Sequence, residues 1–151
     1  MRIAIGSDHA GFKLKAILAA HLKRRGHRVI DMGTHAEESV DYPKYCFPVA
    51  VAVAKKRVDR GIVLGGSGNG EAMSANRVKG VRCALLWNDA TAEFSRLHND
   101  ANVISLGARL TPPAQAKRFV DIWLKTKFEG GRHVRRIQLL DRTPNAVPPK
   151  A

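Results

Sequence analysis

Short apolar segments alternate with helical patterns along this chain, and that alternation narrows the possible folds more than any other feature. Segments 2–7, 29–32, 61–64, 82–86 and 103–106 are typical of strands, whereas 11–25, 41–58, 71–78, 89–97 and 111–127 have the apolar spacing of helices. Strands that alternate with helices predict a parallel sheet with both faces covered. We therefore expect an α/β fold: a three-layer α/β/α sandwich with a five-stranded parallel sheet, Rossmann-like in arrangement.

The boundaries of two helices depend on prolines. Asp41 is expected to cap the helix at 41–58, but Pro48 would cost about 3 kcal/mol deep inside it. Either Pro48 lies within the first turns with a kink, or the regular helix begins near Phe47. Thr111 is expected to cap the later helix, with the two following prolines in its first turn.

The chain is expected to be one domain, because its 151 residues are ordinary for a single domain. Residues 128–151 form an Arg-rich tail, with a short helix expected at 133–141 and a loosely held end, PNAVPPKA. Cys46 and Cys83 lie in apolar surroundings without metal-ligand spacing, so we expect reduced, buried thiols. With neither a secretory h-region at its N-terminus nor any apolar run of the roughly 20 residues that a span requires, the chain is expected to be cytoplasmic and not membrane-bound.

The net charge of +13 attracts anions such as nucleic acids, anionic membranes or phosphorylated metabolites. The basic residues are dispersed along the expected helices, which favours solvated helix faces over a specific nucleic-acid groove. The sequence also contains no cluster of aromatic residues on which bases would stack. We therefore expect no specific nucleic-acid partner.

Three marked sequences follow expected strands: SDHAG at 7–11, GGSGNGE at 65–71 and LGAR at 106–109. In parallel sheets the ligand binds outside the carboxyl ends of the strands. The three sequences are therefore expected to meet at one rim and form a binding site there.

The glycine-rich segment at 65–70 fits neither of the two common nucleotide loops. A dinucleotide fingerprint needs a third glycine where Glu71 stands, and the P-loop spacing at 6–11 is followed by Phe12 and Lys13 instead of Lys and Ser or Thr. A glycine turn before a helix can still hold a phosphate or a developing oxyanion. Glu71 then has two interpretations, a favourable charge at a helix start or a general base directed into the loop.

Several motifs together resemble the ribose/galactose isomerase family, and within it the type B ribose-5-phosphate isomerases. They are GSDHAGF (6–12), DYP (41–43), GGSGNG (65–70), AN (75–76), RLHNDANV (96–103), LGAR (106–109) and EGGRHVRR (129–136). The resemblance implies an aldose–ketose isomerase that needs no metal and no cofactor and interconverts ribose 5-phosphate and ribulose 5-phosphate through a cis-enediolate. It also implies a homodimer, or a dimer of dimers, whose clefts combine residues of both subunits, with the tail at 128–151 packing on the partner.

Within this family the base is either a cysteine at the end of the third strand or a glutamate in the following helix. This chain has Gly65 at the first position and resembles the second subgroup, so we expect Glu71 to be the base. Ser67 is expected to hydrogen-bond the reacting oxygens and His98 to open the furanose ring. The further substrate-binding candidates are Asp8, His9, Tyr42, Gly66, Gly68, Asn69, Gly70, Asn99, Arg109, Arg132 and Arg136.

Among these candidates, arginine suits the phosphate because its planar fork binds two oxygens at once. Arg109, Arg132 and Arg136 are the expected clamp, with His9 assisting. Sugar length stays open at this point: allose 6-phosphate, galactose 6-phosphate and a four-carbon phosphate are alternatives to ribose 5-phosphate.

Overall fold

A computed structural model describes residues 1–142 of the chain. In this part the chain forms one parallel sheet with strand order β2-β1-β3-β5-β4. Its strands are β1 (Arg2–Ser7), β2 (Arg28–Asp31), β3 (Arg60–Gly65), β4 (Cys83–Leu86) and β5 (Val103–Gly107). The predicted five-stranded parallel sheet is confirmed, with strand ends that differ from the expected ones by at most one residue.

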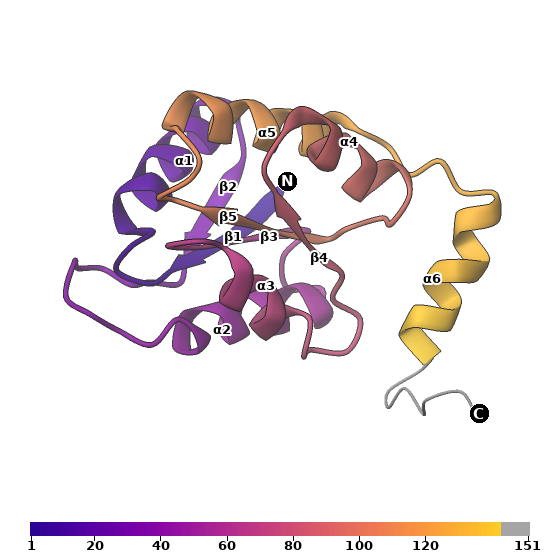
Figure 1. Ribbon diagram of the computed structural model, residues 1–151, viewed down its shortest axis with the longest axis horizontal. Coiled ribbons are helices and arrows are strands. Elements are labelled where there is room, and N and C mark those ends of the chain that lie inside the picture. Colours follow the sequence, from indigo (N-terminus) through magenta and orange to yellow (C-terminus); the bar gives the residue numbers. More distant parts are fainter. Residues whose placement is uncertain (143–151) are drawn as a thin grey trace.

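Helices cover both faces of the sheet, as the alternation predicted. The helices are α1 (Phe12–Arg24), α2 (Pro43–Ala54), α3 (Asn69–Ala75), α4 (Asp89–Leu97), α5 (Pro113–Lys125) and α6 (Arg132–Arg142). Helices α1, α4 and α5 lie on one face and α2 and α3 on the other (Figure 1), which confirms the three-layer sandwich. Helix α6 stands beside this body, far from the N-terminal end of α2 (Figure 1).

Each face of the sheet has its own apolar core. One core joins alternate residues of β1, β3 and β5 to the inner sides of α1 and α5, with Trp123 among its largest fully buried side chains. The other joins the intervening strand residues to α2 and includes Cys46, which is fully buried. Burial raises the pKa of the Cys46 thiol, as expected for a reduced structural cysteine.

Helix α2 differs from the prediction at its start. It begins at Pro43 with Tyr42 as the N-cap, so the expectation that Asp41 caps it is wrong. Pro48 lies inside the regular helix, as one of the two alternatives allowed. Pro48 is exposed, and it deprives the helix of one backbone N–H donor.

Two other helices also begin and end differently than expected. Helix α3 begins two residues early, at Asn69, because Gly68 adopts a left-handed conformation (φ 82°) that turns the chain directly into the helix. It ends at Ala75 and not at Val78, since the next residues form tighter turns. Helix α5 is capped by Pro112 instead of Thr111 and ends at Lys125.

The expected tail helix is present as α6, one residue longer at each end than predicted. The loosely held end expected at PNAVPPKA lies outside the described residues. Within residues 1–142, no helix combines the length and the apolar character that crossing a membrane would require.

Candidate active site

The three marked sequences meet at the carboxyl rim of the sheet and form a cleft of about 510 Å³. Residues from the loops after β1, β3 and β5 and from the start of α2 line it: Asp8, His9, Ala10, Tyr42, Gly66, Ser67, Gly70, Glu71, Arg109 and Leu110. Eight of these ten were expected from the sequence. Ala10 and Leu110 were not, although Ala10 lies within SDHAG and Leu110 directly follows LGAR.

Glu71 supplies a buried carboxylate to the cleft. Its side chain extends from the first turn of α3, and the residue is only 4% exposed. Burial raises the pKa of Glu71, and the negative charge of Asp8 acts in the same direction. The backbone N–H groups of Glu71 and Gly68 oppose this shift by hydrogen bonding to the carboxylate. We expected the backbone N–H groups of this glycine turn to bind a ligand oxyanion. Two of them instead hydrogen-bond to the carboxylate of Glu71.

Gly65 leaves the space in which this carboxylate sits. A Cβ atom added to Gly65 would lie 1.8 Å from Oε1 of Glu71 and 2.2 Å from its carboxyl carbon. No side chain fits at position 65 while Glu71 keeps this rotamer. The glycine is thus required for the approach of a functional group and not for an unusual backbone angle.

Two more glycines of the loop allow other cleft residues to approach closely. A Cβ atom on Gly70 would lie 2.6 Å from the Tyr42 ring, so the phenol rests directly over this glycine. A Cβ atom on Gly66 would lie 3.4 Å from the guanidinium of Arg109. The glycine loop therefore forms a flat floor on which Tyr42 and Arg109 converge beside Glu71.

The hydroxyl of Ser67 lies on the exposed side of this floor. Its Oγ accepts hydrogen bonds from the backbone N–H and the side-chain amide of Asn69, each at 3.3 Å. Gly68 and Asn69 do not line the cleft; they set the direction of the loop, and the Gly68 carbonyl accepts a 2.6 Å hydrogen bond from Ser105. The hydroxyl proton of Ser67 remains available to a ligand, because both of these bonds use Oγ as the acceptor.

Asp8 and His9 line the cleft from the loop after β1, and hydrogen bonds hold both of them in place. Asp8 is 7% exposed, and its Oδ1 accepts a hydrogen bond of 3.0 Å from the N–H of Gly11. The backbone N–H of Val40 donates to Nδ1 of His9 at 3.2 Å. Since an N–H group can only donate, Nδ1 of His9 is unprotonated and its proton sits on Nε2.

Four expected site residues lie elsewhere. His98 and Asn99 follow α4, which runs back across the sheet, so they are at the amino edge of β5 and not at the rim. Arg132 and Arg136 are exposed on α6. One copy of the chain therefore does not bring these four residues to the cleft that contains Glu71.

His98 is part of a stack of rings. It lies between Phe94 at 4.8 Å and His133 at 4.5 Å between ring centroids, with interplanar angles of 6° and 14°. Glu129 approaches both histidines, at 3.8 Å from Nε2 of His98 and 3.4 Å from Nε2 of His133. No role was expected for Phe94 or Glu129, although Glu129 begins the quoted motif EGGRHVRR.

The side chains of His98, Glu129 and His133 offer three possible metal ligands within 4.8 Å of one another, a proximity that the sequence spacing did not indicate. The lone pair of an imidazole lies in the plane of its ring. Two nearly parallel, stacked rings therefore direct their lone pairs side by side and not at one point between them. The stacking holds the His98 ring in place between Phe94 and His133, and the rings are not arranged as ligands of one metal ion.

A second hollow of about 590 Å³ lies between residues 76–84 and the end of α6. Among residues 1–142, its lining includes no buried carboxylate with a raised pKa, and the hollow lies away from the carboxyl rim. We place the site in the rim cleft because a buried carboxylate, a hydroxyl and a guanidinium converge there.

Fold and cleft together define a small α/β enzyme built to bind an anionic metabolite and to move a proton. The sequence model of the Ribose/Galactose Isomerase family matches residues 3–140. The chain belongs to this family and is an isomerase, which confirms the resemblance seen in its motifs.

Individual relatives are similar over nearly the whole chain. Ribose-5-phosphate isomerase B of Mycolicibacterium paratuberculosis is 44% identical, over 98% of this chain and 96% of its own. The structure of Clostridium thermocellum ribose-5-phosphate isomerase B is 49% identical, with a TM-score of 0.92 over 93% of this chain and 95% of its own. The Mycoplasma genitalium ribose-5-phosphate isomerase B, solved with bound ribulose 5-phosphate, is 41% identical, with a TM-score of 0.92 over 97% of both chains.

Proposed function

We propose that this protein interconverts ribose 5-phosphate and ribulose 5-phosphate through a cis-enediolate intermediate. The observation that carries the proposal is the buried carboxylate of Glu71 at the floor of the rim cleft, with its pKa raised by burial. The similar proteins named above are ribose-5-phosphate isomerases, and one was solved with the ketose product of this reaction. We place the reaction in the cytoplasm, as the sequence predicted.

Glu71 acts as the general base. An aldose–ketose isomerisation removes a proton from C2 of the aldose and returns one to C1, and one carboxylate on one face of the enediolate can do both. A pKa raised by burial makes the Glu71 carboxylate a stronger base toward the C2 proton. Ser67 donates to the oxygens at C1 and C2 as negative charge develops on them.

The cleft holds the rest of the sugar phosphate. Arg109 binds the phosphate, and His9 assists through the proton on Nε2 that its bond from Val40 imposes. Asp8 and Tyr42 contact the hydroxyls, and Gly66 and Gly70 contribute to binding by letting Arg109 and Tyr42 lie close to the loop. Gly68 and Asn69 act through the shape of the loop.

A second copy of the chain completes each cleft. His98 and Asn99 of one copy reach the other's cleft, where His98 opens the furanose ring. Arg132 and Arg136, one helical turn apart on α6, add positive charge for the phosphate. The exposed apolar residues of α6, such as Val134 and Leu140, then pack on the partner. The assembly is a homodimer or a dimer of dimers.

Other substrates are tested as alternatives. Allose 6-phosphate, galactose 6-phosphate and a four-carbon sugar phosphate require the same chemistry, so the purified protein should be assayed on all of them. Activity confined to one of these sugars would replace the ribose assignment. Nucleic-acid binding should be weak and lost at moderate salt, because the +13 charge is dispersed.

The decisive assay compares the wild type with Glu71→Gln on ribose 5-phosphate. The variant should fold and bind substrate but lose about 10²–10⁴-fold in turnover, the usual cost of losing a general base. Exposed Glu93 provides the matched control, Glu93→Gln, which should keep full turnover. Near-normal turnover by Glu71→Gln would remove Glu71 from the role of base.

A further inference from the structure

The turn after α4 is held by side chains. Asp100 has a left-handed backbone (φ 45°), which is uncommon for a residue with a side chain. Three consecutive carbonyls of this turn accept hydrogen bonds from buried or half-buried donors: Asn99 from Nε of Arg82 at 3.0 Å, Asp100 from Nη2 of Arg82 at 3.1 Å and Ala101 from Nη1 of Arg96 at 3.0 Å. The indole N–H of Trp123 also donates to the Ala101 carbonyl, at 3.1 Å.

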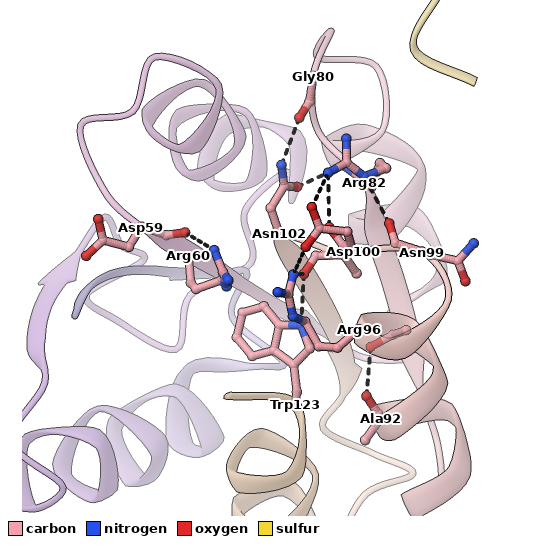
Figure 2. A network of polar contacts seen from close by, with 12 residues as sticks. Asp59, Arg60, Gly80, Arg82, Ala92, Arg96, Asn99, Asp100, Asn102 and Trp123 are labelled. Carbon is pink, nitrogen blue, oxygen red and sulfur yellow. Dashed lines mark hydrogen bonds and ion pairs between the residues drawn. The ribbon is translucent and has the colours of Figure 1, made fainter. Parts of the chain in front are cut away.

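Two arginines share one carboxylate beneath this turn (Figure 2). Asp100 accepts from Arg82 at 3.1 Å and from Arg96 at 2.5 Å. The side chains of Arg82 and Arg96 are only 14% and 8% exposed, so these charges are little screened by water. Such a largely buried network of charged hydrogen bonds fixes one conformation of the backbone that it surrounds. That backbone carries His98 and Asn99.

Arg82 also reaches α6. Its Nη1 donates to both carboxylate oxygens of Asp141, at 3.4 and 3.1 Å, in the last turn of the helix. The other end of α6 is attached to the same turn, since His133 stacks on His98. The helix that carries Arg132 and Arg136 is therefore tied to the His98 turn at both of its ends.

We propose that Arg82 is a positioning residue that holds the 98–101 turn and α6 in one arrangement. The second copy then meets one rigid surface that carries His98, Asn99, Arg132 and Arg136. The inference rests on the proposed function, in which these four residues complete the other copy's cleft. Arg82 itself lines the second hollow and not the rim cleft, so it acts through the residues that it holds.

Only the guanidinium can make these contacts together. One arm, Nε and Nη2, binds the turn, while Nη1 points to Asp141. Lysine keeps the charge but has a single nitrogen, so it cannot bind both segments in this geometry. The substitutions Arg82→Lys and Asp141→Asn therefore separate the two functions: the first loosens both segments, and the second loosens α6 alone.

Steady-state kinetics with ribose 5-phosphate test the kinetic part. Arg82→Lys should lower kcat by about 10–100-fold, because misplacing a catalytic group by about 1 Å can cost 10²-fold. Asp141→Asn should raise KM by about tenfold at nearly constant kcat, because only the phosphate-binding charge is displaced. The control Arg2→Lys changes another carboxylate-paired arginine, which contacts Asp59, and should leave both constants unchanged. Wild-type constants in Arg82→Lys would overturn the proposal.

Amide hydrogen exchange tests the structural part without any substrate. Peptides covering 98–103 and 132–142 should exchange faster in Arg82→Lys, and only 132–142 should do so in Asp141→Asn. Unchanged exchange in both variants would overturn the proposal. Faster exchange together with a wild type inactive on every sugar phosphate would instead refute the proposed function and leave the structural role of Arg82 in place.

Discussion

The carboxylate of Glu71 occupies the volume that a side chain on Gly65 would need, with Oε1 1.8 Å from the position of the missing Cβ. The end of β3 and the first turn of α3 therefore compete for one place in the cleft. A functional group can be supplied from position 65 or from position 71, but not from both in this backbone. The two subgroups expected from the family resemblance, one with cysteine after the third strand and one with glutamate, are understandable as the two solutions of this steric conflict.

Replacement of Gly65 by alanine should therefore act through Glu71. The added methyl must displace the carboxylate, because a Cβ contact under 3.0 Å is not tolerated. We expect Gly65→Ala to fold and to lose about 10²–10³-fold in kcat, approaching the loss expected for removal of the base. The double variant Gly65→Ala/Glu71→Gln is the matched control. It should be no slower than Glu71→Gln alone, since the two changes remove the same group. Additive losses would show that Gly65 matters for another reason.

The raised pKa of Glu71 also predicts how stability depends on pH. Burial places the pKa in the folded state above its usual 4.5, so between these two values the folded protein binds more protons than the unfolded chain. The free energy of unfolding then falls as the pH rises through this interval. Glu71→Gln should unfold at a higher temperature than the wild type at neutral pH, with the difference vanishing below about pH 4.5. Thermal unfolding followed by circular dichroism across this range measures it, with Glu93→Gln as the control for loss of one charge. A Glu71→Gln variant less stable than the wild type at neutral pH would contradict the prediction.

The sequence alone predicts one part of the proposed site, the rim cleft, much better than the other, the four residues that lie away from it. The rim cleft was predictable, because each of its motifs directly follows a strand and parallel strands end at one edge. The placement of His98, Asn99, Arg132 and Arg136 was not. Their roles came from resemblance to a family, which assigns chemistry without assigning a position, and the local patterns of α4 and α6 carry no information about a second copy.

The fold shows the same division. Strand positions followed from apolar runs that must be buried on both faces. The starts of α2, α3 and α5 depended on single residues, such as Pro48, whose exposure the sequence does not reveal, or Gly68, whose left-handed conformation begins α3 two residues early. The network around Arg82 could not be predicted, because it joins residues that are 18 and 59 positions apart.

The α6 arginines should affect substrate binding more than turnover. Arg136→Ala removes a charge that the second copy's cleft would use for the phosphate, so KM for ribose 5-phosphate should rise by at least about tenfold while kcat changes little. Exposed Arg24 on α1 provides the control, Arg24→Ala, which removes the same charge without reaching a cleft. An unchanged KM in Arg136→Ala would exclude this residue from the site. Sedimentation of the wild type should give the dimer that this reach between copies requires.

Activity should survive an excess of chelator. The base, the hydroxyl and the phosphate-binding cations of the proposed mechanism are all protein groups, so no step depends on a metal ion. If a metal ion did bind, the cluster of His98, Glu129 and His133 would be the first place to look, because its possible ligand atoms lie within 4.8 Å of one another. Assays in chelator, and then with added zinc, distinguish activity that needs no metal from activity that depends on a bound metal ion. Loss of activity that zinc restores would contradict the prediction. If His133→Asn then abolished the restoration, the metal would be assigned to this cluster and the stacked rings would have to turn so that their lone pairs converge.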